Sequence, residues 1–226
     1  MLKLSNILLT VTMLVTLVGC SSTPYKRTSS DEAKMKRESA ANTNSALGML
    51  YLQKGDTHRA KQRFLQALEE SPKDPTAWYS IGYFFEVMGE NTKAEQSFLR
   101  AIKLDPQNGD AKNNYGTFLC HTGRYQEGIK QFHAAISAPK YLNTTGAYEN
   151  IGLCAMKIPD YNLAKQYLEK ALALNPKQPE SLEALAKIYY QEHKNDLAIK
   201  YLNQYKALTT TPDKEMIALE AKLKKA

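Results

Sequence analysis

The chain has 226 residues, of which 43% are hydrophobic, 9% aromatic and 23% charged. These fractions are ordinary for a folded globular protein, and they exclude a disordered or low-complexity chain. The formal net charge is +7 at neutral pH. The lysines are scattered along the chain and do not form the basic cluster typical of nucleic-acid binding, so we expect no nucleic-acid partner. Attraction to an anionic or acidic partner is the milder consequence of the charge.

Residues 1–19 have the pattern of an export signal. Lys3 precedes an apolar run from Ile7 to Val18, which is too short for a comfortable transmembrane helix. The run leads into Leu-Val-Gly-Cys, a sequence that resembles the lipobox of bacterial lipoproteins and ends at Cys20. This resemblance implies cleavage before the cysteine and attachment of a diacylglycerol and an N-acyl chain to it. The alternative is a simple signal peptide with an incidental cysteine.

The residues after the lipobox indicate where the lipid would hold the protein. Three acyl chains anchor a protein far more firmly than one. Ser21 and Ser22 follow Cys20, and no aspartate stands there of the kind that retains lipoproteins in the inner membrane. We therefore expect the periplasmic face of the outer membrane. Residues 20–40 are polar and predict a tether that becomes helical near Asp31.

Residues 41–212 repeat with a period of 34 residues, and the fourth copy begins two residues late. The repeated positions are small or bulky apolar residues, with a proline at the end of three copies. The copies are Gly48, Tyr51, Ala60, Phe64, Ala67 and Pro72; Gly82, Phe85, Ala94, Phe98, Ala101 and Pro106; Gly116, Leu119, Gly128, Phe132 and Ala135; Gly152, Ala155, Ala164, Leu168, Ala171 and Pro176; and, more weakly, Ala186, Tyr189, Ala198 and Leu202.

This period resembles that of the tetratricopeptide repeat (TPR) family, in which each repeat is a helix, a turn and a helix. The resemblance implies an all-α TPR superhelix of about five to six helix-turn-helix repeats. The residue types agree, because a small residue such as Gly82 lets the first helix of a repeat approach the second closely. A proline such as Pro106 has no N–H and a fixed φ, so it ends the second helix.

Residues 213–226 predict a C-terminal capping helix. Its lysine-rich end suits the negative end of a helix dipole. A truncated sixth repeat is the alternative, and both predict helix. The expected inner side of this helix carries Met216, Ile217, Leu219 and Leu223.

Two cysteines remain after Cys20 is assigned to lipid. Cys120 and Cys154 lie on the first helices of consecutive repeats, and such helices run side by side in a TPR stack. Since an exported protein is in an oxidising compartment, we predict a disulfide between them. Two buried free thiols are the alternative.

TPR proteins generally bind a peptide or a helix of a partner along the concave side formed by their first helices. The residues expected there are apolar and aromatic in the first two repeats, a composition typical of binding hot spots. The alternative for any one of them is packing against a neighbouring repeat. The expected groove residues are Asn42, Ser45, Met49 and Leu52; Tyr79, Tyr83, Glu86 and Val87; Asn113, Thr117 and His121; and Glu149, Leu153 and Met156.

The third and fourth repeats carry a further resemblance. Asparagines at 113, 114 and 150, the cysteine pair and the insertion at 138–146 resemble those of the TPR lipoproteins of type IV pilus biogenesis, the PilF/PilW family. With the lipobox, the resemblance covers nearly the whole mature chain, and the degenerate fifth repeat departs from it. It implies a pilotin: a lipid-anchored adaptor that binds the pilus secretin subunit and promotes its localisation and multimer assembly. The alternative is a general periplasmic TPR adaptor for murein enzymes or their regulators.

The sequence gives no support for an enzyme, a cofactor, a metal site or a small-molecule substrate. Cys120 is followed by His121, with His133 further along, but neighbouring residues on a helix face different directions. A disulfide would also remove the nucleophile. The four histidines lack metal-ligand spacing.

Overall fold

The computed structural model describes residues 28–225, and the expected signal peptide and Cys20 lie outside them. This part of the chain forms eleven helices and no strand, as the all-α prediction required. The helices are α1 (Ser29–Gln53), α2 (Thr57–Glu70), α3 (Pro75–Val87), α4 (Asn91–Leu104), α5 (Gly109–His121), α6 (Tyr125–Ile136), α7 (Thr144–Lys157), α8 (Tyr161–Leu174), α9 (Pro179–Gln191), α10 (Asn195–Leu208) and α11 (Lys214–Leu223).

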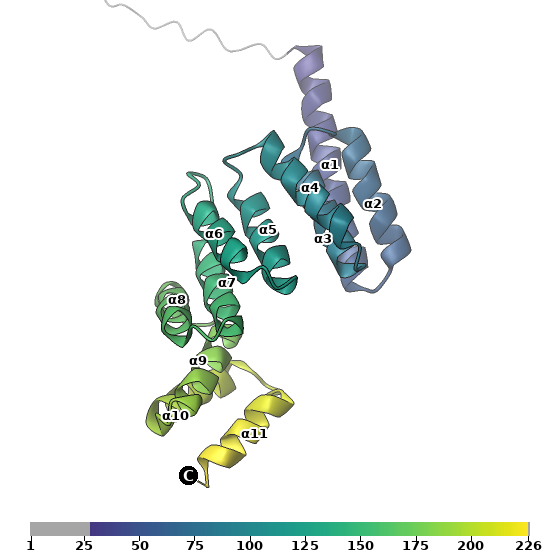
Figure 1. The fold of residues 1–226 in the computed structure, drawn as a ribbon. Helices are drawn as coiled ribbons and strands as arrows, with labels where there is room; N and C mark the ends of the chain where they lie inside the picture. Colours follow the sequence, from purple (N-terminus) through teal and green to yellow (C-terminus); the bar gives the residue numbers. More distant parts are fainter. Residues whose placement is uncertain (1–27, 226) are drawn as a thin grey trace, which may run out of the picture.

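The helices form five hairpins that follow one another along an extended, curved stack, with α11 at its end (Figure 1). The first helices of successive hairpins contact one another directly: α1 with α3, α3 with α5, α5 with α7, and α7 with α9. Each second helix instead contacts the first helix of the next hairpin. The first helices therefore make one continuous inner wall, and the second helices lie outside it.

Close contact between the two helices of a hairpin depends on glycine. A Cβ atom added at Gly82 would lie 3.0 Å from the ring of Phe98, and one added at Gly152 would lie 2.5 Å from Cγ of Leu168. The partners are fully buried, and so are their equivalents Phe64 and Phe132. The 34-residue period thus records one contact made in each of the first four repeats.

Local signals fix where most helices begin. At the start of six helices an aspartate or asparagine side chain accepts a hydrogen bond from a backbone N–H of the first turn, the usual role of these residues at an N-cap. These caps are Asp56, Asp74, Asn108, Asn143, Asp160 and Asp213. At α1 Thr28 and Asp31 form a reciprocal capping box, so helix begins at Ser29, inside the segment expected to be a tether.

The insertion between the third and fourth repeats is anchored by one aromatic side chain. Tyr141 is buried with Ala138 and Ala147, and its ring packs so closely on Gly109 that a Cβ added there would lie 2.5 Å from Cβ of the tyrosine. The adjacent Leu142 is 95% exposed. The longer connection is therefore pinned at Tyr141 before α7 begins.

The end of the stack corrects one expectation. Met216, Leu219 and Leu223 of α11 are buried, as expected for the inner side of a cap. Ile217 is 55% exposed, so its placement on that side was wrong. Counting 34 residues on from Glu183 gives Ile217, which puts it at the position that faces the inner wall in the preceding repeats.

The glycine contact predicts a stability effect. Replacing Gly152→Val adds three carbons where a single Cβ already meets Leu168 at 2.5 Å. We expect overpacking to lower the free energy of unfolding by about 2–3 kcal/mol, measured by urea denaturation. The matched control is Ala173→Val on the exposed side of α8. Equal stability of the two variants would contradict the contact.

Candidate partner-binding groove

The inner wall holds three pockets, one after another along the stack. They have volumes of about 440, 490 and 570 Å³ from the N-terminal to the C-terminal repeats. All three are lined mainly by residues of the first helices. The wall is therefore open along several repeats, as a groove for a polypeptide requires.

The N-terminal pocket has the apolar and aromatic lining expected from the sequence. Met49 of α1 and Tyr79 and Tyr83 of α3 line it together with Asn42 and Ser45. The tyrosines also pack against the core formed by Phe98 and its neighbours, which fixes their orientation. Burial raises the pKa of Tyr79 above its ordinary value, so its hydroxyl stays a hydrogen-bond donor at neutral pH.

The middle pocket joins α3 to α5. Tyr83, Glu86, Val87 and His121 line it, all four of them expected groove residues. Nδ1 of His121 lies 2.7 Å from Oε1 of Glu86 and links two consecutive first helices. This pair makes the pocket polar on one side and leaves Val87, which is 48% exposed, on the other.

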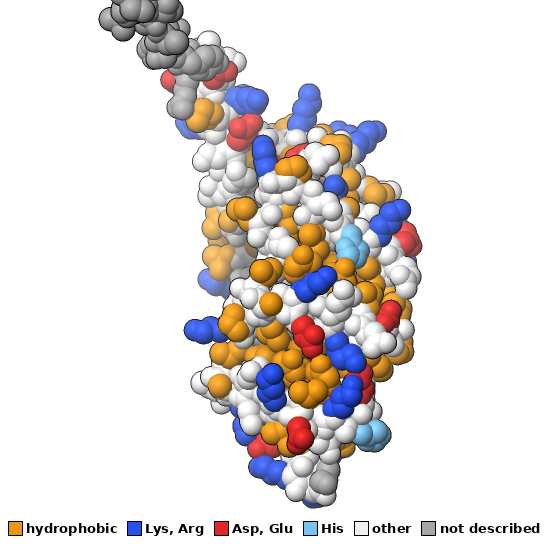
Figure 2. Space-filling view, turned by 90° about the vertical axis from the view of Figure 1, so that its left-hand side faces the viewer, with side chains coloured by type: hydrophobic (Ala, Val, Ile, Leu, Met, Phe, Trp, Pro, Cys, Tyr) orange, Lys and Arg blue, Asp and Glu red, His pale blue; other side chains and the backbone are white. Residues whose placement is uncertain are grey.

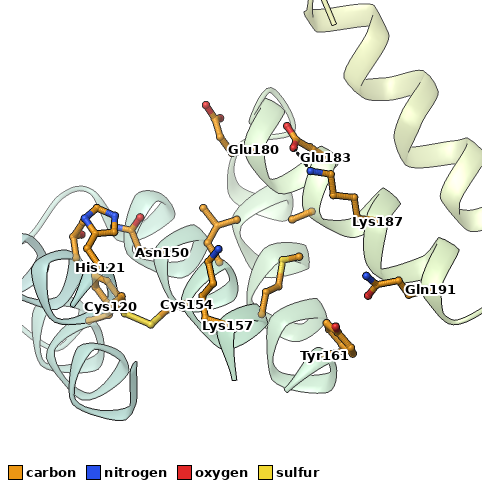
Figure 3. Close-up of a pocket in the computed structure, with 15 residues that line it drawn as sticks. Cys120, His121, Asn150, Cys154, Lys157, Tyr161, Glu180, Glu183, Lys187 and Gln191 are labelled. Carbon is orange, nitrogen blue, oxygen red and sulfur yellow. Dashed lines mark hydrogen bonds and ion pairs between the residues drawn. A yellow bond between two sulfur atoms is a disulfide. The ribbon is translucent and has the colours of Figure 1, made fainter. Parts of the chain in front are cut away.

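The C-terminal pocket spans α5, α7 and α9 (Figure 3). Thr117, His121, Leu153 and Met156, all expected from the sequence, line it beside the Cys120–Cys154 bond. Residues of α8 and α9 complete the lining; they are Tyr161, Glu180, Glu183, Ala184, Lys187 and Gln191. This pocket carries more charged groups than the other two.

Three of the expected groove residues line none of these pockets. Leu52 packs against the core around Phe64. Asn113 accepts a hydrogen bond from Nδ2 of Asn150 at 3.1 Å, which ties α5 to α7. The third, Glu149, reaches across the repeat boundary.

Glu149 caps the next repeat. Its Oε1 accepts hydrogen bonds from the backbone N–H of Ser181 at 3.1 Å and from the Ser181 hydroxyl at 2.7 Å. Ser181 lies in the first turn of α9, whose own N-cap residue, Gln178, makes no side-chain capping bond. Burial raises the pKa of Glu149, and the hydrogen bonds from Ser181 oppose that shift. A carboxylate from α7 thus does for α9 what a local aspartate does elsewhere.

The fifth repeat supplies lining residues that sequence reasoning missed. Glu183, Lys187 and Gln191 lie 34 residues after Glu149, Leu153 and Lys157, respectively. Extending the groove positions by one period would have found them. The weak match of this repeat at its core positions hid the fact that its wall-facing positions continue the pattern.

The sulfurs of Cys120 and Cys154 are 1.93 Å apart, and the Cα atoms 5.9 Å, which is the geometry of a disulfide (Figure 3). The third repeat has Gly128 where the other four have alanine. A Cβ added at Gly128 would lie 2.4 Å from Sγ of Cys120. The glycine therefore makes room for the sulfur, and the two departures from the repeat belong together.

Charge and metal ligands place limits on other kinds of site. Figure 2 shows Lys and Arg side chains dispersed among acidic and apolar ones on the side it displays. In residues 28–225 no group of three or more His, Cys, Asp or Glu side chains is arranged to hold a metal ion. Among the helices formed by these residues, none is both long and apolar enough to cross a membrane.

Comparison with known families defines the class of protein. Tetratricopeptide repeat models match residues 45–109, 97–130 and 160–223, which together make up more than half of the chain. With the stacked hairpins, this establishes a TPR protein and confirms the predicted superhelix.

The relatives narrow the class to one family. The chain is 30% identical over 195 residues to the type IV pilus assembly protein PilF of Pseudomonas aeruginosa, which covers 84% of this chain and 75% of the relative. A solved structure of P. aeruginosa PilF matches with a TM-score of 0.77 and 29% identity, covering 84% of this chain and 85% of that one. The structure of PilW, a widely conserved type IV pilus biogenesis factor, gives 0.75 and 28%, covering 82% and 84%. The chain belongs to the PilF/PilW family of type IV pilus biogenesis TPR proteins.

The cap formed by Glu149 predicts a pH effect. The folded state raises the pKa of this carboxyl above its ordinary value of 4.5, so stability falls as pH rises from that value through the folded pKa. Glu149→Gln keeps an oxygen that accepts from Ser181 but cannot ionise. We expect the variant to gain stability relative to the wild type between pH 4 and pH 7, measured by urea denaturation. A stability difference independent of pH would contradict this linkage.

The disulfide predicts a stability effect of reduction. It closes a span of 34 residues, for which loss of chain entropy gives about 3–4 kcal/mol as an upper figure. We expect dithiothreitol to lower the urea midpoint of the wild type. The control is the double variant Cys120→Ala, Cys154→Ala, which dithiothreitol should leave unchanged. Two titratable thiols in the untreated mature protein would show that the bond is absent.

Proposed function

We propose that this protein is a pilotin: an outer-membrane lipoprotein that binds the secretin subunit of a type IV pilus and promotes its localisation and multimer assembly. The observation that carries the proposal is the similarity to PilF over 84% of the chain, which includes all of the repeats that form the inner wall. The lipid would be attached at Cys20, before the part of the chain that begins the superhelix. We further propose that the protein is not an enzyme.

The physical role of such a protein is to concentrate and orient a partner. A lipid anchor confines the adaptor to a membrane surface, and a bound subunit then encounters other subunits at a raised local concentration. Binding alone provides this effect, so no reaction is needed. The bond between Cys120 and Cys154 leaves neither sulfur free as a nucleophile, which is consistent with a scaffold.

The N-terminal pocket is the most suitable anchor point for the secretin. Met49, Tyr79 and Tyr83 form an open apolar and aromatic lining, and such residues concentrate binding energy at protein interfaces. Both tyrosines are half-buried, so they are held in place while part of each ring remains accessible. The partner segment would lie along the wall from this pocket toward the next repeats.

Charge substitution in this pocket tests the proposal. We expect the double variant Tyr79→Glu, Tyr83→Glu to bind the secretin at least about 30-fold more weakly, because truncating a hot spot costs 2 kcal/mol or more. In cells lacking the wild-type gene, the variant should fail to restore heat-stable secretin multimers in the outer-membrane fraction. Leu99→Glu, a change on α4 at an exposed position outside the three pockets, is the matched control. Circular dichroism checks that both variants keep their helices.

Two outcomes separate the possible failures. Normal multimers and normal piliation after deletion of the gene would reject the pilotin role and favour the adaptor for murein enzymes. Loss of multimers on deletion, with full rescue by the tyrosine variant, would keep the role but place the secretin elsewhere on the protein.

A further inference from the structure

The C-terminal pocket has an apolar floor of defined size. Leu153 and Met156 of α7, Ala184 of α9 and the disulfide contribute apolar surface to a volume of about 570 Å³. The disulfide and the core beneath it hold these helices together, so the floor is preformed. A pocket of this size admits one bulky aliphatic or aromatic side chain of a polypeptide.

Most charged groups around the pocket are already paired. Nζ of Lys187 is bonded to Oε1 of Glu183 at 2.6 Å and also to Glu215 of α11. His121 is bonded to Glu86. These pairs need no charge from a ligand, so they do not select one.

Two lining groups are different. Within residues 28–225, neither Lys157 at the end of α7 nor Glu180 at the start of α9 has a hydrogen bond or an ion pair. Both are exposed to solvent. In Figure 3 Glu180 stands at the upper edge of the pocket and Lys157 in its lower part, so the two unpaired charges lie at different places around the floor.

The edge at Glu180 is made more acidic by its surroundings. Glu149 lies close enough that the negative charge of Glu180 adds to burial in disfavouring ionisation of Glu149. Glu149 is occupied by Ser181 and cannot turn outward without uncapping α9. A cation from a ligand at Glu180 would reduce this repulsion, and an anion would find its counterpart at Lys157.

We propose that this pocket binds an extended peptide segment in which an apolar residue is flanked by one acidic and one basic residue. The apolar side chain fills the floor over Leu153 and Met156, the acidic side chain pairs with Lys157, and the basic one pairs with Glu180. The inference rests on the proposed function only in taking the ligand to be a polypeptide. It adds a second anchor to the wall, with a charge requirement that the N-terminal pocket lacks.

Three acetylated, amidated pentapeptides test the charge requirement: Asp-Gly-Leu-Gly-Lys, Asp-Gly-Leu-Gly-Asp and Lys-Gly-Leu-Gly-Lys. Binding to the mature wild-type protein is followed by NMR chemical shifts at millimolar peptide. We expect the mixed-charge peptide to bind best and to shift the amides of α7 and α9. Exposed ion pairs support a preference of about three- to fivefold over each like-charged peptide. Replacing its leucine with serine should abolish binding.

Charge reversal of the protein makes the test specific. Lys157→Glu should prefer the peptide with two lysines, and Glu180→Lys the peptide with two aspartates. Lys130→Glu, an exposed change on α6 that lies outside the pocket lining, should keep the wild-type order. No binding by the wild type, shifts outside the pocket, or the same peptide order in every variant would overturn the proposal. Secretin multimers in cells are measured separately, so that loss of this site and loss of the pilotin role can be told apart.

Discussion

The structure depends on one close contact, repeated along the chain, between a glycine in the first helix of a hairpin and a bulky side chain in the second. Gly82 on Phe98 and Gly152 on Leu168 leave no room for even one added carbon. Because this contact satisfies each hairpin internally, hairpins need only their sequential neighbours to complete the core. The first helices then line up as a wall that no other part of residues 28–225 covers along its three pockets. An open binding surface follows from the way the repeat is packed.

This dependence explains why much of the fold could be predicted from the sequence. The contacts that define a repeat are local and recur at a fixed spacing, so the glycines, their partners and the prolines marked the helices without reference to distant residues. The same spacing placed Met49, Tyr79 and Tyr83 in one pocket. Where the pattern was weak, in the fifth repeat, its wall residues Glu183 and Lys187 were missed, although their spacing was regular.

The residues that could not be predicted act across repeat boundaries. Glu149 occupies a wall-facing position, yet its carboxylate turns to cap α9, because Gln178 supplies no cap there. Ile217 was assigned to the core from its apolar character alone, but α11 is the last helix and no further repeat covers that side. Such roles depend on what a neighbouring repeat lacks, and the periodic pattern does not contain that information.

The boundary between the third and fourth repeats divides the wall into two chemically different halves. There Gly128 makes room for the sulfur of Cys120, and Gly109 makes room for Tyr141 of the insertion, so two departures from the repeat are each matched by a glycine. On one side the wall is aromatic and carries no charge in its first pocket. On the other it carries unpaired charges of both signs. A polypeptide that fits both halves can lie along the wall in only one direction, since exchanging its ends would bring its charged residues to the apolar pocket. The break in the repeat thus gives a periodic wall a defined polarity.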